Sequence, residues 1–438
     1  MTHAQPDSDV GNGVSQEGAQ HDVAVRHFRR NAALLISEAG AFMAGLAFFD
    51  SGTVYPLLLA KLGASDVLIG ASRLVQVLGY TLPALVAAHR IHGRANHKSF
   101  MLATCAMARV GLCTLPVALL YLSVQRPGFA LAWVFSIVAL FWLMDGACAV
   151  SWFDIVAKAV PARVRGRFFG IMQTVAGLLA IGAGLLVQRI LRSPALPYPQ
   201  NFALLGGLWF AGAMLSQLGL TLIVEPPGVQ DKEETRPSFV EYLRRTPVLL
   251  HRYPRLRGLI ITRVFLDGAM LAAPFYVLFA QRDLGASLSV AGVYTVAQNI
   301  GRVATGPLWG WLSDRVGTTA SVRTIAVCIL LAPVLALSST EERAWLMVLV
   351  FGLMGAVMDG AWMVMSTALL ESVREEDRPL AVGVASVCQT PSALYGPAGG
   401  FLAGVTSYRT VFTVAAGISL LGVVSSFRLP RWDPTQGR

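Results

Sequence analysis

A series of apolar runs, each about 20 residues long, recurs along nearly the whole chain and limits what it can fold into. Of the 438 residues, 55% are hydrophobic and only 14% are charged, whereas a soluble chain carries about 25% charged residues. A helix needs runs of this length to cross a bilayer, while outer-membrane strands alternate in polarity and are about half as long. We therefore expect an all-α integral membrane protein. Its twelve predicted spans cover residues 31–60, 67–88, 99–122, 129–157, 167–190, 201–224, 257–281, 287–313, 321–339, 344–370, 379–405 and 408–427.

A polar segment after the sixth run divides the predicted helices into two groups of six. This segment, "EPPGVQDKEETRPSFVEYLRRTPVLLHRYPRLRG" (225–258), is rich in charged residues and proline. The predicted organisation is a disordered cytoplasmic N-terminus (1–30), an N-terminal six-helix bundle (31–224), a cytoplasmic central loop (225–257), a C-terminal six-helix bundle (258–427) and a cytoplasmic tail (428–438).

The positions of the basic residues predict an orientation. The formal net charge is +10, and most of the 35 lysines and arginines lie before the first run, in alternate loops and after the last run. Cytoplasmic loops of membrane proteins carry this excess. We expect both termini to be cytoplasmic and the protein to lie in the cell inner membrane. Because topology explains the charge, nucleic acid is not a predicted partner.

The cysteines and histidines predict neither a cofactor nor a metal site. All five cysteines lie within apolar runs, which indicates packing residues and not an extracellular disulfide framework. His89, His92 and His97 share one basic loop. Metal binding and pH sensing are alternatives for these three histidines, and we favour simple solvation.

The two halves contain an internal repeat. "LGASDVLIGASRLVQVLGYTLP" (62–83) matches "LGASLSVAGVYTVAQNIGRVATGP" (284–307), and Asp145-Gly-Ala matches Asp359-Gly-Ala. Order and direction are preserved, so we expect parallel repeats related by an axis along the membrane normal. The first match pairs Leu62, Gly63, Ala64, Ser65, Gly70, Gln76 and Gly79 with Leu284, Gly285, Ala286, Ser287, Gly292, Gln298 and Gly301.

A short motif between the eighth and ninth runs resembles a known family. "GPLWGWLSDRVG" (306–317) is similar to the Gly-x-x-x-Asp-Arg-x-Gly signature of the major facilitator superfamily. The resemblance implies that family's twelve-helix fold and gating roles for Gly310, Asp314, Arg315 and Gly317. The matching loop of the first half carries His92 at the position of Asp314, so the usual acidic latch is missing there.

Six ionisable residues lie near the middle of predicted spans, where an unpaired charge is expensive. Such groups must face the bundle interior and be paired, protonated or hydrated. Four acids and two bases cannot neutralise one another completely, which favours proton coupling or a cationic substrate. The candidate substrate and coupling residues are Asp50, Asp145, Asp267, Asp359, Arg109 and Arg302.

Asp50 and Asp267 occupy comparable places in the first helix of each half, and the resemblance implies that these helices line a central cavity. Pro56 and Pro274 follow them and predict bends in both helices. A buried structural pair is the alternative for each aspartate, and for Asp267 the partner is Arg263 one turn earlier. For Arg302 we favour neutralisation of an aspartate.

The predicted function is secondary active transport of a small solute by alternating access, coupled to protons. The excess of buried acids favours export of amphipathic or cationic molecules. The expected partners are the small-molecule substrate, protons and the lipid bilayer, and we expect a monomer. A transporter-like sensor or lipid-interacting protein without solute flux is the alternative. An enzyme is not predicted, because the spans contain no histidine and no metal-ligand spacing.

Overall fold

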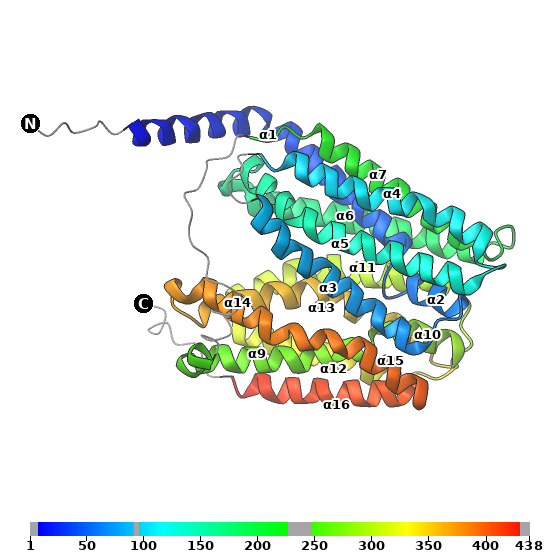
Figure 1. Ribbon diagram of the computed structural model, residues 1–438. Helices are drawn as coiled ribbons and strands as arrows, with labels where there is room; N and C mark the ends of the chain where they lie inside the picture. Colours follow the sequence, from blue (N-terminus) through cyan, green and yellow to red (C-terminus); the bar gives the residue numbers. More distant parts are fainter. Residues whose placement is uncertain (1–7, 92–95, 227–246, 430–438) are drawn as a thin grey trace, which may run out of the picture.

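The computed structural model describes residues 8–91, 96–226 and 247–429, and within these ranges every regular element is a helix (Figure 1). The first half contains α1 (Ser8–Phe48), α2 (Val54–Lys61), α3 (Asp66–Ile91), α4 (Lys98–Leu122), α5 (Pro127–Ala159), α6 (Ala162–Arg192) and α7 (Gln200–Leu222). The second half contains α9 (Pro254–Leu266), η1 (Asp267–Leu271), η2 (Ala273–Phe275), α10 (Tyr276–Arg282), α11 (Val290–Arg315), α12 (Thr318–Leu337), α13 (Leu346–Glu371), η3 (Glu375–Asp377), α14 (Arg378–Gln389), η4 (Thr390–Leu394), α15 (Tyr395–Val405) and α16 (Tyr408–Phe427).

The two halves lie side by side with their helices roughly along one direction (Figure 1). We call the end where α7 finishes and α9 begins the terminal end, and the other the opposite end. Ten helical segments of the described chain are long and apolar enough to cross a membrane. The remaining two predicted spans, 287–313 and 379–405, are α11 and the α14–η4–α15 segment, which run between the same two ends. The predicted all-α, twelve-span architecture is confirmed.

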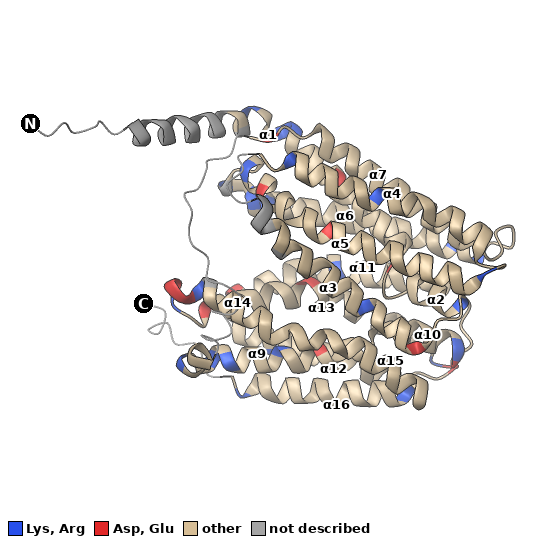
Figure 2. Cartoon of the chain, viewed as in Figure 1, with Lys and Arg blue, Asp and Glu red and all other residues tan. Residues whose placement is uncertain are grey.

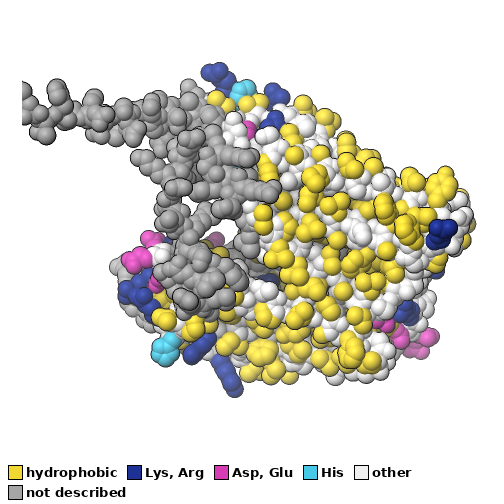
Figure 3. Space-filling model, viewed as in Figure 1, with side chains coloured by type: hydrophobic (Ala, Val, Ile, Leu, Met, Phe, Trp, Pro, Cys, Tyr) yellow, Lys and Arg dark blue, Asp and Glu magenta, His cyan; other side chains and the backbone are white. Residues whose placement is uncertain are grey.

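The surface between the two ends is apolar. Most charged residues gather at the ends of the helices (Figure 2), and hydrophobic side chains cover the middle of the visible face (Figure 3). Large apolar side chains such as Val110 of α4, Leu215 of α7 and Phe401 of α15 are exposed. A band of this kind is expected where helices face lipid, because lipid tails exclude unpaired charges.

Three of the predicted spans are interrupted. The first breaks between Phe48 and Val54, and 3-10 segments interrupt the seventh and the eleventh. Pro56, Pro274 and Pro391 lie at or beside these breaks, where proline removes a backbone hydrogen-bond donor. Non-helical backbone at membrane depth is tolerated where it is buried in protein or lines a cavity, so these breaks locate the interior of the bundle.

The repeated glycines hold the same structural positions in both halves. Gly63 and Gly285 have φ of +83° and +64°, the left-handed region that favours glycine. A Cβ at Gly79 would lie 3.1 Å from α5, and a Cβ at Gly301 would lie 2.0 Å from a carbonyl oxygen of α13. The α3–α5 and α11–α13 pairs are therefore equivalent.

Close glycine contacts also join the two halves near the opposite end. A Cβ at Gly70 of α3 would lie 2.1 Å from the carbonyl oxygen of Gly396, and one at Gly292 of α11 would lie 2.2 Å from the backbone nitrogen of Gln188 on α6. Contacts this short leave no room for a side chain. The halves are thus closed against each other at the opposite end.

The start of α1 differs from the sequence-based expectation. The helix begins at Ser8, so residues 8–30 are helical where disorder is predicted. The physical reason is that residues 8–48 contain no proline to interrupt a helix that the first span already nucleates. Residues 1–7, together with 227–246 of the predicted central loop and 430–438 of the predicted tail, lie outside the described residues.

Candidate functional site

A cavity of about 550 Å³ lies between the two halves, and we call it the central cavity. Its wall comes from α1, the α1–α2 break, α3, α5, α6, α7, η1, η2, α11 and α13. Four of the six predicted residues line it: Asp50, Asp145, Asp359 and Arg302.

Asp50 lies at the break between α1 and α2. Its Oδ1 accepts hydrogen bonds from the Gly52 backbone N–H at 2.9 Å and the Thr53 hydroxyl at 3.0 Å. The Thr53 hydroxyl also lies 2.8 Å from the hydroxyl of Thr295 on the other half. Oδ2 has no hydrogen-bond partner among the described residues, so this oxygen is left for a proton or a ligand.

The repeat partners Asp145 and Asp359 bring one carboxylate from each half to the cavity. Oδ2 of Asp359 lies 3.2 Å from Nε of Arg302, as the neutralisation interpretation of Arg302 predicts. Asp145, in contrast, forms no hydrogen bond or ion pair within the described ranges. The repeat therefore places two equivalent acids in one cavity. Of these two, only Asp359 forms an ion pair among the described residues.

Sequence reasoning missed several polar residues of the cavity, among them Arg73, Gln76 and Gln298. Nη1 of Arg73 donates to Oε1 of Gln76 at 2.5 Å. Nε of Arg73 and Oε1 of Gln298 are buried without a hydrogen-bond partner in the described structure. The repeat itself was the available signal, because it pairs Gln76 with Gln298. Unpaired buried polar atoms are costly, so these two atoms are suited to binding a polar ligand.

The central cavity combines excess acid with aromatic surface. Three aspartates and two arginines line it, which leaves one carboxylate without a basic counterpart. Phe49 stacks on Trp209 with ring centroids 5.1 Å apart, and Trp142 lies in the same wall. Such a cavity can hold a proton or a cationic group while the aromatic rings contact an apolar body.

A second cavity of about 570 Å³ adjoins the first, and we call it the inner chamber. Both cavities share Phe42, Met43, Tyr80, Asp145 and Gln173. The inner chamber extends toward the terminal end of the molecule, because Trp152, Phe169 and Leu220 also line it. Asp145 therefore lies where the two cavities meet.

Arg109 lines the inner chamber and not the central cavity. It is 4% exposed, and its Nη2 donates to the Ser216 hydroxyl at 3.4 Å. That hydroxyl donates to Oε1 of Glu38 at 3.0 Å, and Trp152 Nε1 donates to Oε2 at 3.2 Å. Arg109 and Glu38 thus form a buried polar network, with Ser216 between them.

Asp267 lies outside the central cavity. Its Oδ1 is 2.9 Å from Nε of Arg263, so the structure contains the ion pair that the alternative interpretation of Asp267 names. The comparable aspartates in the first helix of each half therefore have different surroundings: Asp50 lines the central cavity, whereas Asp267 pairs with Arg263. Asp50 lies in the break between α1 and α2, whereas Asp267 is the first residue of the 3-10 segment η1, one turn after Arg263.

The predicted gating residues lie at the terminal end of α11 and in the turn before α12. Asp314 and Arg315 are exposed and form no ion pair among the residues described. Gly317 has φ of +100°, which the turn requires and glycine allows. A Cβ at Gly310 would meet no atom of the described residues within 4 Å, so none of the described helices approaches closely there in this state.

The opposite end, in contrast, carries a polar latch between the halves. The Tyr408 hydroxyl of α16 donates to Oδ1 of Asp66 on α3 at 3.1 Å, and Nη1 of Arg282 lies 2.5 Å from that hydroxyl and 3.5 Å from the same oxygen. We call Asp66, Arg282 and Tyr408 the polar latch. Together with the glycine contacts, it closes the central cavity toward this end.

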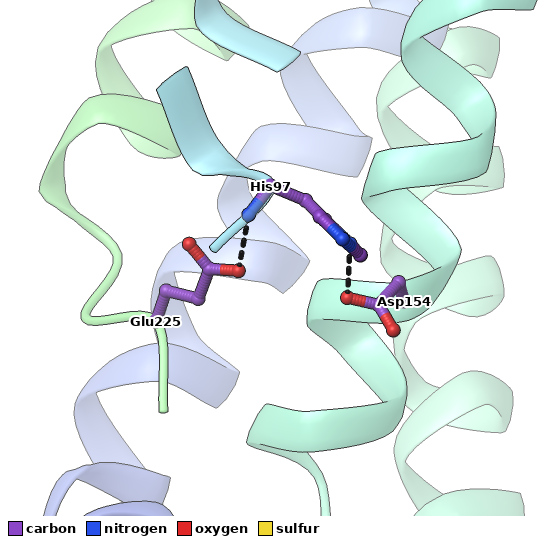
Figure 4. A group of neighbouring side chains, drawn as sticks. All are labelled: His97, Asp154 and Glu225. Atoms are coloured by element: carbon purple, nitrogen blue, oxygen red, sulfur yellow. Dashed lines mark hydrogen bonds and ion pairs between the residues drawn. The ribbon is translucent and has the colours of Figure 1, made fainter. Parts of the chain in front are cut away.

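One histidine of the predicted basic loop takes part in a charge cluster (Figure 4). Nδ1 of His97 lies 2.7 Å from Oδ2 of Asp154, and its backbone N–H donates to Glu225 at 2.8 Å. The three residues offer ligand atoms within 4.8 Å of one another. Nζ of Lys158, however, lies 2.6 Å from Asp154 and 3.7 Å from Glu225. Because this ammonium already occupies the place of a cation, we assign the cluster to tethering α4, α5 and the end of α7.

The other two histidines of that loop are not placed, because the side chains of His89 and His92 lie outside the described residues.

Comparison with known proteins gives a family match for the second half and a fold match for the whole chain. The sequence model of the Major Facilitator Superfamily matches residues 259–437. A search of curated proteins by sequence finds no match.

Three solved structures illustrate the likeness in fold. The nucleoside transporter NupG, as a mutant, aligns with a TM-score of 0.69 at 15% identity, covering 92% of this chain and 100% of that one. A bacterial homologue of the iron transporter ferroportin in an inward-facing state gives 0.67 at 12%, covering 91% and 98%. A D-xylose-proton symporter gives 0.62 at 12%, covering 94% and 98%.

Proposed function

We propose that this chain belongs to the major facilitator superfamily and is a secondary active transporter of a small solute, because residues 259–437 match the family's sequence model and 92% of the chain aligns with the fold of a solved transporter. The solute would bind in the central cavity, and the two halves would rock about it to expose it to one side of the membrane at a time. The observation that carries this proposal is a cavity between the two repeats that contains charged side chains and is closed toward the opposite end.

Proton coupling is proposed for Asp50 and Asp145. Each has a carboxylate oxygen in the cavity wall without a hydrogen-bond partner among the described residues, so each can exchange a proton for a cationic group. Asp359 is already paired with Arg302. Gln76, Gln298 and Arg73 would bind the polar part of the solute.

The proposed substrate class is amphipathic or cationic small molecules, and the proposed direction is export. The unbalanced aspartate supports the positive charge, and the stacked rings of Phe49 and Trp209 support the apolar part. Among the solved structures of the same fold, the xylose transporter is described as proton-coupled. The positive-inside rule supports a cytoplasmic position for the terminal end in a cell inner membrane. The described state is then inward-facing.

Gating by two opposed sets of contacts follows from this orientation. The polar latch closes the outer end in the described state. Asp314 and Arg315, with Gly310 and Gly317, would close the cytoplasmic end in the other state, where Gly310 allows a helix to approach. No acidic partner is expected from the loop with His92, so the two sides of this gate would differ.

Replacing Arg282 with Gln should shift the protein toward the outward-facing state. The Arg282 side chain is 45% exposed, so its contacts are worth at most about 1 kcal/mol and the shift should be no more than roughly fivefold. A membrane-impermeant maleimide is added on the side of the membrane that the opposite end of the molecule faces. It should label Ser51→Cys, a variant in the wall of the central cavity, up to roughly fivefold faster in the Arg282→Gln background. Arg343→Gln, an exposed change at the same end, should leave the rate unchanged. Equal rates in both backgrounds would show that the polar latch does not control access.

The test of function uses purified protein in liposomes that contain a pH-sensitive dye. A pH gradient is imposed, and organic cations, organic anions, sugars and lipids are added in turn. We expect at least one organic cation to dissipate the gradient only when the protein is present. Proton movement with anions alone would reassign the site to Arg73 and Arg302. No proton movement and no uptake with any compound would favour a sensor or lipid-interacting protein.

A further inference from the structure

Two cysteine thiols meet in the wall of the inner chamber. Sγ of Cys105 on α4 lies 2.7 Å from Sγ of Cys148 on α5. Both residues are almost fully buried, at 2% and 5% exposure, and both line the chamber. The sequence predicts only packing roles for them, and packing does not require two thiols in contact.

Small residues bring α4 and α5 close enough for this contact. Ala108 and Ala147 lie beside the cysteines, and farther along the antiparallel pair a Cβ at Gly111 would lie 3.2 Å from Leu140. A disulfide needs a sulfur–sulfur distance of about 2.05 Å between residues that already face each other. The two sulfurs therefore lie within about 1 Å of the distance of a disulfide bond.

The thiol pair is next to the charged groups of the chamber. Arg109 follows Cys105 by one turn and donates to the Cys105 carbonyl oxygen at 3.1 Å. Asp145 precedes Cys148 by one turn and lines both cavities. A covalent link between the cysteines would consequently fix α4 and α5 beside these two residues.

We propose that Cys105 and Cys148 form a reversible disulfide when a hydroperoxide enters the inner chamber. One sulfur attacks the peroxide, the O–O bond breaks, and the peroxide leaves as water or an alcohol while the cysteine becomes a sulfenic acid. The second sulfur displaces the sulfenic hydroxyl as water and forms the S–S bond. Two thiols lose two electrons and two protons, and the hydroperoxide accepts both. Thiol–disulfide exchange with a cellular thiol reverses the reaction.

The other cysteines provide matched controls. Cys113 lies on the same helix as Cys105 but is exposed, and its Sγ contacts the carbonyl oxygen of Val110. Cys328 and Cys388 lie in the second half and are partly buried. Position in the chamber, and not cysteine content, should therefore decide which thiols pair.

The test uses the full-length protein in lipid nanodiscs and does not depend on transport activity. The protein is treated with hydrogen peroxide, blocked with N-ethylmaleimide and examined by intact mass and peptide mapping. We expect two fewer blocked thiols, a linked peptide pair containing Cys105 and Cys148, and full reversal by dithiothreitol. Cys113→Ser should retain the link, whereas Cys148→Ser and Cys105→Ser should lose it.

The wild-type peptide map decides the proposal even if a variant folds poorly. Complete maleimide blocking of both Cys105 and Cys148 after peroxide would overturn it. Oxidation of the two sulfurs to separate sulfinic acids, or a link from either one to Cys113, would overturn it as well.

Discussion

Asp50→Asn is expected to abolish the dependence of solute flux on a pH gradient while leaving the fold intact. Asparagine keeps the acceptor oxygen that bonds Gly52 and Thr53, but it cannot exchange a proton. Coupling between two sites is commonly worth 1–3 kcal/mol, so proton-driven accumulation should fall by about tenfold or more. Liposome flux with and without an imposed gradient measures this, for a solute identified by the dye assay.

The control for this prediction is Glu341→Gln, which changes an exposed acid in the loop before α13. It should leave both the gradient dependence and the thermal unfolding unchanged. If Asp50→Asn kept full proton coupling, Asp50 could not be the coupling group, and Asp145 would become the candidate.

Arg109→Met should cause the largest loss of stability. Glu38 is 6% exposed and receives Ser216 and Trp152 as hydrogen-bond donors, with Arg109 as the nearby cation in the same network. Removing one charge of a buried network typically costs about 3–5 kcal/mol, because the other charge is left uncompensated. Chemical unfolding of the purified protein in detergent measures the change.

A second substitution separates charge from packing in this network. Arg109→Met combined with Glu38→Gln removes both charges and should recover most of the lost stability. Arg126→Met, an exposed change at the start of α5, should have little effect. Equal stability of the single and double variants would show that the two charges do not compensate each other.

The architecture followed from sequence because its determinants are local or periodic. The lengths of the apolar runs predict the positions of the spans. The repeat pairs Gly63 with Gly285, and both glycines have positive φ angles. The helix interruptions could be expected at Pro56 and Pro274. The effect of these interruptions on Asp50 and Asp267 could not be expected from the sequence. A shift of one helical turn decides whether a carboxylate faces the cavity or contacts Arg263.

The site was only partly predictable, because depth in a span does not say which way a side chain points. Of the six predicted residues, Asp50, Asp145, Asp359 and Arg302 line the central cavity. Arg109 lies in the neighbouring chamber instead, since α4 presents it to Glu38 and Ser216. Arg73 was not among the predicted residues, yet it lines the central cavity. Tertiary packing, which no single span contains, decides these cases.

The most direct test of the central claim is thermal unfolding of the purified protein against organic cations, organic anions, sugars and lipids at two pH values. A ligand that binds the folded state raises its stability by RT ln(1 + [L]/Kd). The account predicts stabilisation by a cationic or amphipathic compound that weakens at low pH, where protons compete for the carboxylates, and disappears in Asp50→Asn. Stabilisation by anions alone, or by a cation equally at both pH values and in Asp50→Asn, would contradict an acidic, proton-coupled substrate site.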